Sequence, residues 1–234
     1  MKINDPAAVA RQYATENNLE ARRSLYANVE GPDPREVAFA AVAEIAPQRV
    51  LEVGGGPGEL SARIAEELGC EVVMVDVSPR MVELARARGV DARVGDAQRL
   101  PFPDGAFDCV VAAWVLFHLE DIDAGVAELG RVLRPGGRLV ATTNAIEHMQ
   151  ELREIAGTAS WARVFTRENG AEVIGRHFAE VERRDTDGWA TIDDDETVRA
   201  FVASLQPDEM PDLPPYELPL RCRRASSVFV ATKA

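Results

Sequence analysis

A cluster of glycines follows a short apolar run and could bind a ligand through the main chain. The apolar run extends from Val50 to Val53, and glycines stand at positions 54, 55, 56 and 58. The run predicts a buried strand, and the pattern after the glycines predicts a helix. Because glycine has no Cβ, a ligand can lie almost against this part of the backbone. The amides at the start of the helix would attract a phosphate or a carboxylate.

A carboxylate at the end of the next predicted strand could bind a ribose. Glu71–Asp76 reads as a buried strand, and its carboxyl end would lie beside the glycine loop, where open α/β sheets bind ligands. An acid about twenty residues after the glycines can accept both ribose hydroxyls of an adenosine. Proteins that bind NAD use the same feature, so Asp76 alone does not separate cofactors. The dinucleotide fingerprint itself fails, because its third glycine would fall at Glu59 or Ser61.

Two segments resemble signatures of the class I S-adenosylmethionine-dependent methyltransferases. Glu52, Gly54, Gly56 and Gly58 match the first signature, Glu-x-Gly-x-Gly-x-Gly. Residues 95–108, Gly-Asp-Ala-Gln-Arg-Leu-Pro-Phe-Pro-Asp-Gly-Ala-Phe-Asp, closely resemble the family's segment after the third strand. The resemblance covers about residues 47–145 with specific motifs and is looser elsewhere. It implies that the cofactor is S-adenosylmethionine.

The resemblance also implies how single residues would contact this cofactor. Asp96 would accept a hydrogen bond from the adenine amino group, and Ala97 would offer its backbone amide. Glu52 would help fix the loop and receive the cofactor's ammonium group. Ala113, at the end of the fourth strand, would contact the methionine part through its backbone. The predicted cofactor site consists of Tyr13, Glu52, Gly54, Gly56, Gly58, Asp76, Val77, Met81, Asp96, Ala97 and Ala113.

Two further residues have two open interpretations each. In the family, N-terminal helices cover the cofactor and often bring a tyrosine over it. Tyr13 is the candidate here, and packing of the cap onto the core is the alternative. His118 follows the fourth strand at the ligand-binding edge, so it could line the acceptor pocket or act as a catalytic base. The alternative is a structural histidine that only stabilises the loop. Phe117 stands at the first position of the family's usual histidine pair, which argues against a dedicated dyad.

The elements that would position these residues alternate between strands and helices. This alternation predicts an α/β fold with a doubly wound, mostly parallel sheet, and the resemblance implies a Rossmann-like sheet of seven strands. Ser226–Thr232 would be the last strand, and the resemblance implies that it lies antiparallel beside the strand Leu139–Thr143. We expect a single domain over residues 1–234. It would comprise a helical cap at 1–46, a cofactor-binding core at 47–145, and the acceptor-pocket elements and C-terminal strands at 146–234.

Composition limits the compartment and the partners. The formal net charge of -13 disfavours nucleic acid as the substrate. The three cysteines lack metal-ligand spacing, and helix capping explains the acidic run at 193–196, so we expect no metal. The N-terminus is polar without a secretory signal, and no apolar run approaches membrane-spanning length. We therefore expect a cytoplasmic protein that does not associate with membranes.

The sequence thus predicts an enzyme that transfers the methyl group of S-adenosylmethionine to a small-molecule acceptor. A methyl group on a positive sulfur is already activated, so the protein mainly aligns the acceptor, the methyl group and the sulfur. A non-catalytic protein that binds S-adenosylmethionine is one alternative, and an NAD-dependent oxidoreductase is a less favoured one. The sequence determines neither the acceptor and its methylated atom (oxygen, nitrogen or carbon) nor the use of a base nor the oligomeric state.

Overall fold

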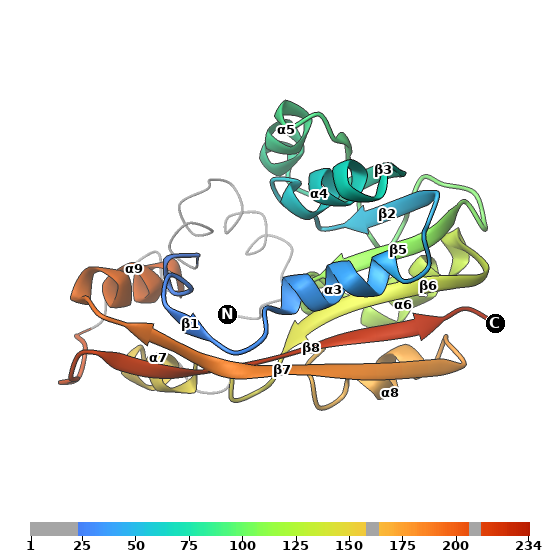
Figure 1. Cartoon of the computed structure of the whole chain (residues 1–234). Helices are drawn as coiled ribbons and strands as arrows, with labels where there is room; N and C mark the ends of the chain where they lie inside the picture. Colours follow the sequence, from blue (N-terminus) through green and yellow to red (C-terminus); the bar gives the residue numbers. More distant parts are fainter. Residues whose placement is uncertain (1–22, 158–163, 206–211) are drawn as a thin grey trace.

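A computed structural model describes residues 23–157, 164–205 and 212–234, and an eight-stranded sheet forms its centre (Figure 1). The strand order is β1-β7-β8-β6-β5-β2-β3-β4. The strands are β1 (Val29–Glu30), β2 (Arg49–Val53), β3 (Glu71–Asp76), β4 (Asp91–Val94), β5 (Phe107–Ala113), β6 (Leu133–Asn144), β7 (Glu180–Ile192) and β8 (Leu220–Thr232). All pairs among β2 to β6 are parallel, and β8 lies antiparallel between β6 and β7. The expected doubly wound, mostly parallel sheet with an antiparallel last strand is therefore confirmed.

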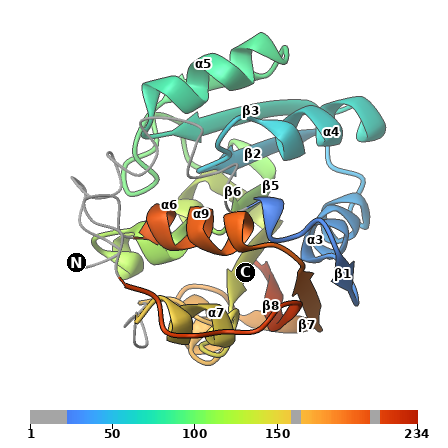
Figure 2. The ribbon, with the colours of Figure 1, turned by 90° about the vertical axis from the view of Figure 1, so that its left-hand side faces the viewer.

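Helices cover both faces of this sheet (Figures 1 and 2). They are α3 (Pro34–Ala43), α4 (Glu59–Leu68), α5 (Pro79–Ala87), α6 (Ile122–Val132), α7 (Gln150–Ile155), α8 (Gly170–Gly175), α9 (Asp195–Leu205) and the 3₁₀ helix η1 (Leu116–His118). Neighbouring residues of β5 point to opposite faces. Val110 packs in the cluster that contains Leu129 of α6, whereas Val111 packs in the cluster that contains Ile64 of α4. Burial on both faces explains why the central strands are almost uniformly apolar.

Local sequence signals set the helix ends. Asp33 precedes Pro34 at the start of α3, and its carboxylate accepts a hydrogen bond from the backbone N of Arg35 at 2.8 Å. At the start of α9, the Asp194 carboxylate accepts from the backbone N of Thr197 at 2.7 Å, as the capping interpretation of the acidic run requires. Gly69 ends α4 in the left-handed conformation, with a φ of 65°. These ends depend on neighbouring residues, which is why the sequence predicts them.

The expected number of seven strands is wrong, because Val29–Glu30 forms an eighth strand where the sequence predicted part of a helical cap. This short strand, β1, pairs antiparallel with Trp189 and Ala190 of β7. The two strands approach so closely that a Cβ on Gly188 would lie 2.0 Å from the Glu30 carbonyl oxygen. Pairing with a strand about 160 residues away overrides the local helical preference, and no local pattern reveals it.

The antiparallel strands extend beyond the parallel part of the sheet. β8 begins at Leu220, six residues before the expected start at Ser226, and its first residues pair only with β7. In Figure 1 this extension carries α7 and α9 at one end of the molecule. A separate apolar cluster fills it, formed by Leu25, Met149, Leu152, Ala190, Ile192, Val198, Phe201 and Cys222. The C-terminal part of the chain therefore has a core of its own beside the cofactor-binding strands.

Two further observations concern the cysteines and the helices. The three cysteines are free thiols, and burial raises the pKa of Cys109 and of Cys222 to about 12. Buried thiols such as those of Cys109 and Cys222 are chemically inert. Among the helices of the described residues, none has both the length and the apolar character needed to cross a membrane.

Candidate active site

The glycine loop joins the carboxyl end of β2 to α4. Gly54 has a φ of 66°, and a Cβ at this position would lie 2.3 Å from Cγ2 of Val115. The loop therefore needs glycine here to pack against the segment that follows β5. Gly56 has a φ of 56°, and a Cβ on it would meet no atom within 4 Å. The space in front of Gly56 is open, which leaves room for a ligand close to the main chain.

Gly58 has a different position from the other glycines of the motif. It is the N-cap residue of α4, with a φ of 78°. A Cβ on Gly58 would lie 2.7 Å from the Cβ of Ala85 in α5. Gly58 is buried and does not line the cavity described below. Its place in the structure is consistent with close packing of α4 against α5, and direct cofactor contact through Gly58 stays a prediction.

Asp76 lies at the end of β3, with its carboxylate beside the glycine loop. One carboxylate oxygen accepts a hydrogen bond from the backbone N of Gly56 at 3.0 Å, and the other from the backbone N of Ser78 at 2.8 Å. Only 8% of Asp76 is exposed. Burial raises the pKa of this carboxyl above its usual range, and the two backbone hydrogen bonds oppose that effect. Each oxygen keeps a further lone pair, so the carboxylate can still accept ribose hydroxyls.

Glu52 points from β2 into the base of the same loop. It is 2% exposed, and the hydroxyl of Ser61 in α4 donates a hydrogen bond to its carboxylate. Burial raises the pKa of Glu52 to about 7, and the negative charge of nearby Asp76 acts in the same direction, whereas the Ser61 hydrogen bond opposes it. The contact with Ser61 links the end of β2 to α4 across the loop. That Glu52 fixes the loop in this way stays a prediction. Binding of an ammonium group stays a prediction.

Asp96 and Ala97 begin the loop that follows β4. The Asp96 carboxylate accepts from the backbone N of Gln98 at 2.9 Å, and the Gln98 side-chain oxygen accepts from the backbone N of Asp121 at 2.8 Å. Asp96 is exposed, whereas Ala97 is only 6% exposed. The loop therefore holds Asp96 at the surface of the cavity through a turn that is anchored to the start of α6.

The segment after β5 forms the opposite side of the site. Trp114 follows the strand with a φ of 54°, an unusual conformation for a bulky residue. His118 ends η1, and its backbone N donates to the carbonyl oxygen of Val115 at 2.9 Å. The His118 ring is half-buried and lies 4.5 Å from the Phe117 ring, measured between centroids. This segment brings an imidazole and an indole to the ligand-binding edge of the sheet.

These segments surround one cavity of about 760 Å³. It is lined by ten of the predicted residues: Glu52, Gly54, Gly56, Asp76, Val77, Met81, Asp96, Ala97, Ala113 and His118. Tyr13 lies outside the described residues. The strand order places Asp76 and Asp96 near the β3–β4 side of the cavity and His118 on the β5 side. The structure thus brings residues from four strand ends to one space.

Sequence reasoning did not select several residues that line this cavity. They are Arg23, Arg35, Gly55, Pro57, Gln98, Trp114, Val115, Leu119 and Glu120, together with other loop residues. The positions of Trp114 and Val115, directly after a buried strand at the ligand-binding edge, were a usable signal. Arg23 had none, because its guanidinium reaches the site by pairing with Glu59 at 2.7 Å, across the fold.

The chemistry of the cavity fits S-adenosylmethionine. The Asp76 carboxylate can accept from a ribose diol, and the exposed Asp96 carboxylate from an exocyclic amine. Val77 is 52% exposed beside Asp76 and offers an apolar surface for a flat base. Glu52 and Asp76 supply negative charge for a cationic ligand. The open space before Gly56 admits the ligand close to the backbone.

Comparison with known proteins supports this assignment. A family model described as a methyltransferase domain matches residues 51–141. The demethylmenaquinone methyltransferase of Thermus thermophilus is 45% identical over 104 residues, which cover 42% of this chain and 47% of the relative. The chain thus spans about half the length of this curated relative. The resemblance to class I S-adenosylmethionine-dependent methyltransferases is confirmed for this segment, which supports S-adenosylmethionine as the cofactor.

Solved structures share the fold at low sequence identity. Phosphoethanolamine N-methyltransferase 2 of Haemonchus contortus, in complex with phosphomonomethylethanolamine and S-adenosylhomocysteine, has a TM-score of 0.67 at 19% identity, covering 100% of this chain and 60% of that chain. The cyclase SpnF has a TM-score of 0.62 at 20% identity, covering 96% of this chain and 95% of that chain. The fold is therefore shared by proteins with different reactions, so the reaction must be argued from the site.

Proposed function

We propose that this chain, whose residues 51–141 form a methyltransferase domain of the class I S-adenosylmethionine-dependent type, transfers a methyl group from this cofactor to a small molecule. The observation that carries the proposal is the single cavity that joins two kinds of surface. Its β3–β4 side has the carboxylates of Asp76 and Asp96, which suit an adenosine. Its β5 side has His118 and Trp114, beyond Ala113, where an acceptor would lie.

The chain would promote the reaction mainly by alignment. When bound, S-adenosylmethionine supplies a methyl group on a positively charged sulfur, which needs no further activation. Asp76 and the Gly54–Gly56 backbone would hold the adenosine part, and Ala113 would border the methionine part. The strand ends and loops that line the cavity would fix the direction of approach, and such orientation can account for much of the rate enhancement.

His118 would lie at the acceptor end and hold or remove the acceptor's proton. Its ring is at the cavity wall, half-buried, on a short helix fixed by the Val115 carbonyl. A base is needed only if the acceptor is a hydroxyl, a phenol or a carbon acid, because a neutral amine can attack directly. His118 therefore contributes to turnover rather than to cofactor binding.

We propose that the methyl acceptor is a small organic molecule. One relative is named for demethylmenaquinone and one structural neighbour for phosphoethanolamine, so hydroquinones and amines are the first candidates. The net charge of -13 argues against a polyanionic acceptor. The buried free thiols suit the reducing cytoplasm. We propose one methyltransferase domain, with the elements after residue 145 building the acceptor pocket.

Two measurements test the proposed function. Calorimetric titration should show binding of S-adenosylmethionine and S-adenosylhomocysteine in the micromolar range, about −8 kcal/mol, and no comparable binding of NAD. A panel with a hydroquinone, a catechol, a primary amine and a carboxylate should then yield S-adenosylhomocysteine with at least one acceptor. Binding of NAD alone would refute the cofactor. Cofactor binding with no turnover on a broad panel would favour the non-catalytic alternative.

The role of His118 has its own test. His118→Ala should lower turnover by about a hundredfold, the usual effect of losing a base, and leave the affinity for S-adenosylhomocysteine nearly unchanged. His177→Ala is the matched control, because His177 contacts Asp123 at 3.1 Å outside the cavity. A lower melting temperature with unchanged activity per folded molecule would instead assign His118 a structural role.

A further inference from the structure

Trp114 stands in a conformation that its own sequence does not favour. Its φ of 54° lies in the left-handed region, which glycine and asparagine adopt more readily. The backbone N of Trp114 donates to the carbonyl oxygen of Thr142 in β6 at 2.9 Å, so the turn is fixed at the strand end. A bulky residue persists in such a conformation only where its surroundings enforce it, and such sites often have a functional role. The surroundings of Trp114 therefore need an explanation.

The indole is held by Asn144 at the end of β6. Nε1 of Trp114 donates to Oδ1 of Asn144 at 2.9 Å. Indole nitrogen is only a donor, so the Asn144 atom that faces it must be the oxygen. The Ser226 hydroxyl lies 2.8 Å from the same oxygen and must therefore also donate. One amide oxygen thus joins the cavity wall to β8.

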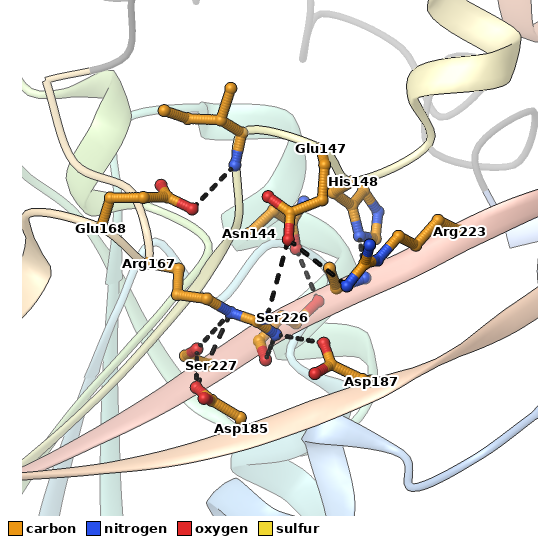
Figure 3. Close-up of polar contacts among 12 residues, drawn as sticks. Asn144, Glu147, His148, Arg167, Glu168, Asp185, Asp187, Arg223, Ser226 and Ser227 are labelled. Atoms are coloured by element: carbon orange, nitrogen blue, oxygen red, sulfur yellow. Dashed lines mark hydrogen bonds and ion pairs between the residues drawn. The ribbon is translucent and has the colours of Figure 1, made fainter.

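A buried arginine, Arg167, contacts the backbone of Asn144 and of its partner Ser226 (Figure 3). The backbone N of Arg167 donates to the Asn144 carbonyl oxygen at 3.2 Å, and its Nη2 donates to the Ser226 carbonyl oxygen at 2.6 Å. Its Nε donates to the Ser227 hydroxyl at 2.8 Å, and Asp187 pairs with Nη2 at 2.7 Å. Arg167 is only 8% exposed. Such a buried, satisfied network is rigid, so Asn144 has little freedom to move.

The hydrogen bond also determines what Trp114 offers to the cavity. Its only polar group is used by Asn144, so the indole can present only carbon atoms to a ligand. Val115 and Leu119 line the same side of the cavity. The wall beside His118 therefore contains an apolar and aromatic part formed by Trp114, Val115 and Leu119, next to the imidazole and to Glu120. Such a wall suits the flat, apolar part of an acceptor.

We propose that Asn144 is a positioning residue, which holds the Trp114 indole as the apolar wall at the acceptor end of the cavity. This role rests on the proposed methyl transfer for its effect on turnover. The position of the indole itself does not depend on whether the protein transfers a methyl group. Neither residue needs to touch the cofactor's adenosine, so the proposal separates acceptor recognition from cofactor binding.

The test compares two substitutions of similar volume. Asn144→Leu removes the side-chain oxygen that accepts the hydrogen bond from the Trp114 indole, whereas Asn144→Asp keeps an oxygen at this position. With an acceptor found in the panel, Asn144→Leu should raise the acceptor KM or lower kcat by on the order of tenfold to a hundredfold, as small misplacements do. The Kd for S-adenosylhomocysteine should stay within about threefold, and Asn144→Asp should restore most of the activity.

A spectroscopic measurement tests the same contact without any acceptor. In a Trp161→Phe, Trp189→Phe background, Trp114 is the only remaining tryptophan of three. Asn144→Leu should shift its emission to longer wavelength and increase its quenching by acrylamide, because the freed N–H turns toward water. Asn144→Asp should leave both unchanged. Ser227→Ala, which loses only a contact to Arg167 and to Asp185, is the control for lost stability and should also leave the emission unchanged.

The outcomes separate this proposal from the proposed function. Unchanged emission and quenching in Asn144→Leu would overturn the positioning role, even if the protein methylates an acceptor. So would equal kinetic defects in Asn144→Leu and Ser227→Ala, because that result assigns the effect to stability. A wild-type protein that binds no S-adenosylhomocysteine would refute the proposed function, whereas the emission shift would still support the contact between Asn144 and Trp114.

Discussion

The β2–β5 side and the β6–β8 side of the sheet form their polar contacts in different ways. On the β2–β5 side, the acids stand at or just after strand ends and bond to residues two positions further on, as Asp76 bonds to Ser78 and Asp96 to Gln98. Asp76 also bonds to Gly56 in the adjacent glycine loop. On the β6–β8 side, Arg167 bonds to Ser227, 60 residues away. Local motifs therefore create the cofactor end of the site, and long-range strand pairing creates the support behind its acceptor end.

The two sides also differ in how their charges are satisfied. Within residues 23–157, 164–205 and 212–234, neither Glu52 nor Asp76 forms a salt bridge, and burial raises the pKa of both. In contrast, Arg167 has Glu147, Asp185 and Asp187 around it. Unpaired buried acids cost stability and favour a cationic ligand, whereas the paired arginine stabilises the fold. Changes on the first side should thus affect cofactor binding, whereas changes around Arg167 should affect stability and leave cofactor binding unchanged.

The largest effect is expected for Gly54→Ala on the cofactor side. The new Cβ would lie 2.3 Å from Val115, at a φ of 66° that alanine disfavours. The loop or the β5 end must then move, and the affinity for S-adenosylhomocysteine should fall by more than about a hundredfold, since such shifts misplace several contacts. Calorimetric titration measures this loss.

Gly69→Ala provides the matched control for that substitution. Gly69 has nearly the same φ, 65°, but a Cβ there would meet no atom within 4 Å. It should therefore cost only about 1 kcal/mol of stability and leave the affinity unchanged. Equal affinity losses in both variants would show that the loop does not depend on its contact with Val115.

Asp76→Ala should have the next largest effect. It removes the acceptor for the ribose hydroxyls and also the two backbone contacts, to Gly56 and Ser78. The affinity for S-adenosylhomocysteine should fall about ten- to a hundredfold, or 1.5–3 kcal/mol. Asp108→Ala is the control: its carboxylate also accepts from two backbone N atoms, those of Gln48 and Arg49, but lies outside the cavity. Normal affinity in Asp76→Ala would refute the ribose assignment.

The same contrast explains what could be predicted from the sequence. The strand, glycine loop and helix around Gly54 are visible because turns, caps and buried runs leave local patterns. Asp76 and Asp96 are visible because they stand at the end of a strand or just after one. The pairing of Val29–Glu30 with β7 leaves no local pattern, and neither does the contact of Trp114 with Asn144, 30 residues away. Both arise only when distant strands become neighbours.

Arg167→Leu tests the C-terminal side, where stability should change and cofactor affinity should not. The substitution leaves Asp187 and the hydroxyl of Ser227 without their buried partner, and the free energy of unfolding should fall by about 2–3 kcal/mol. The affinity for S-adenosylhomocysteine should stay within about twofold. Arg183→Leu is the matched control, because Arg183 pairs with Asp185 in an exposed position and should cost less than about 1 kcal/mol. Urea unfolding and calorimetry together measure both quantities, and a large loss of affinity in Arg167→Leu would contradict the division between the two sides.

The smallest expected effect concerns the pH dependence that Glu52 confers. Its pKa is about 7 in the folded protein and 4.5 in its unperturbed state. Between these values the folded protein keeps a proton that the unfolded chain has lost, so stability without ligand falls as the pH rises from about 4.5 to about 7. Above pH 7 this group causes no further change. Asp76 contributes in the same direction, because its pKa is also raised.

Binding should depend on pH in the opposite direction, because a cationic ligand favours the ionised form of Glu52. The affinity for S-adenosylmethionine should rise between pH 6 and pH 8, by at most about tenfold if only ionised Glu52 binds. Glu52→Gln should flatten both the binding and the stability profiles. Ser61→Ala, which removes the hydrogen bond that favours the ionised carboxylate, should move the midpoint to higher pH. Identical pH profiles for the wild type and Glu52→Gln, measured by calorimetry and urea unfolding, would show that the charge of Glu52 has no part in binding the cofactor.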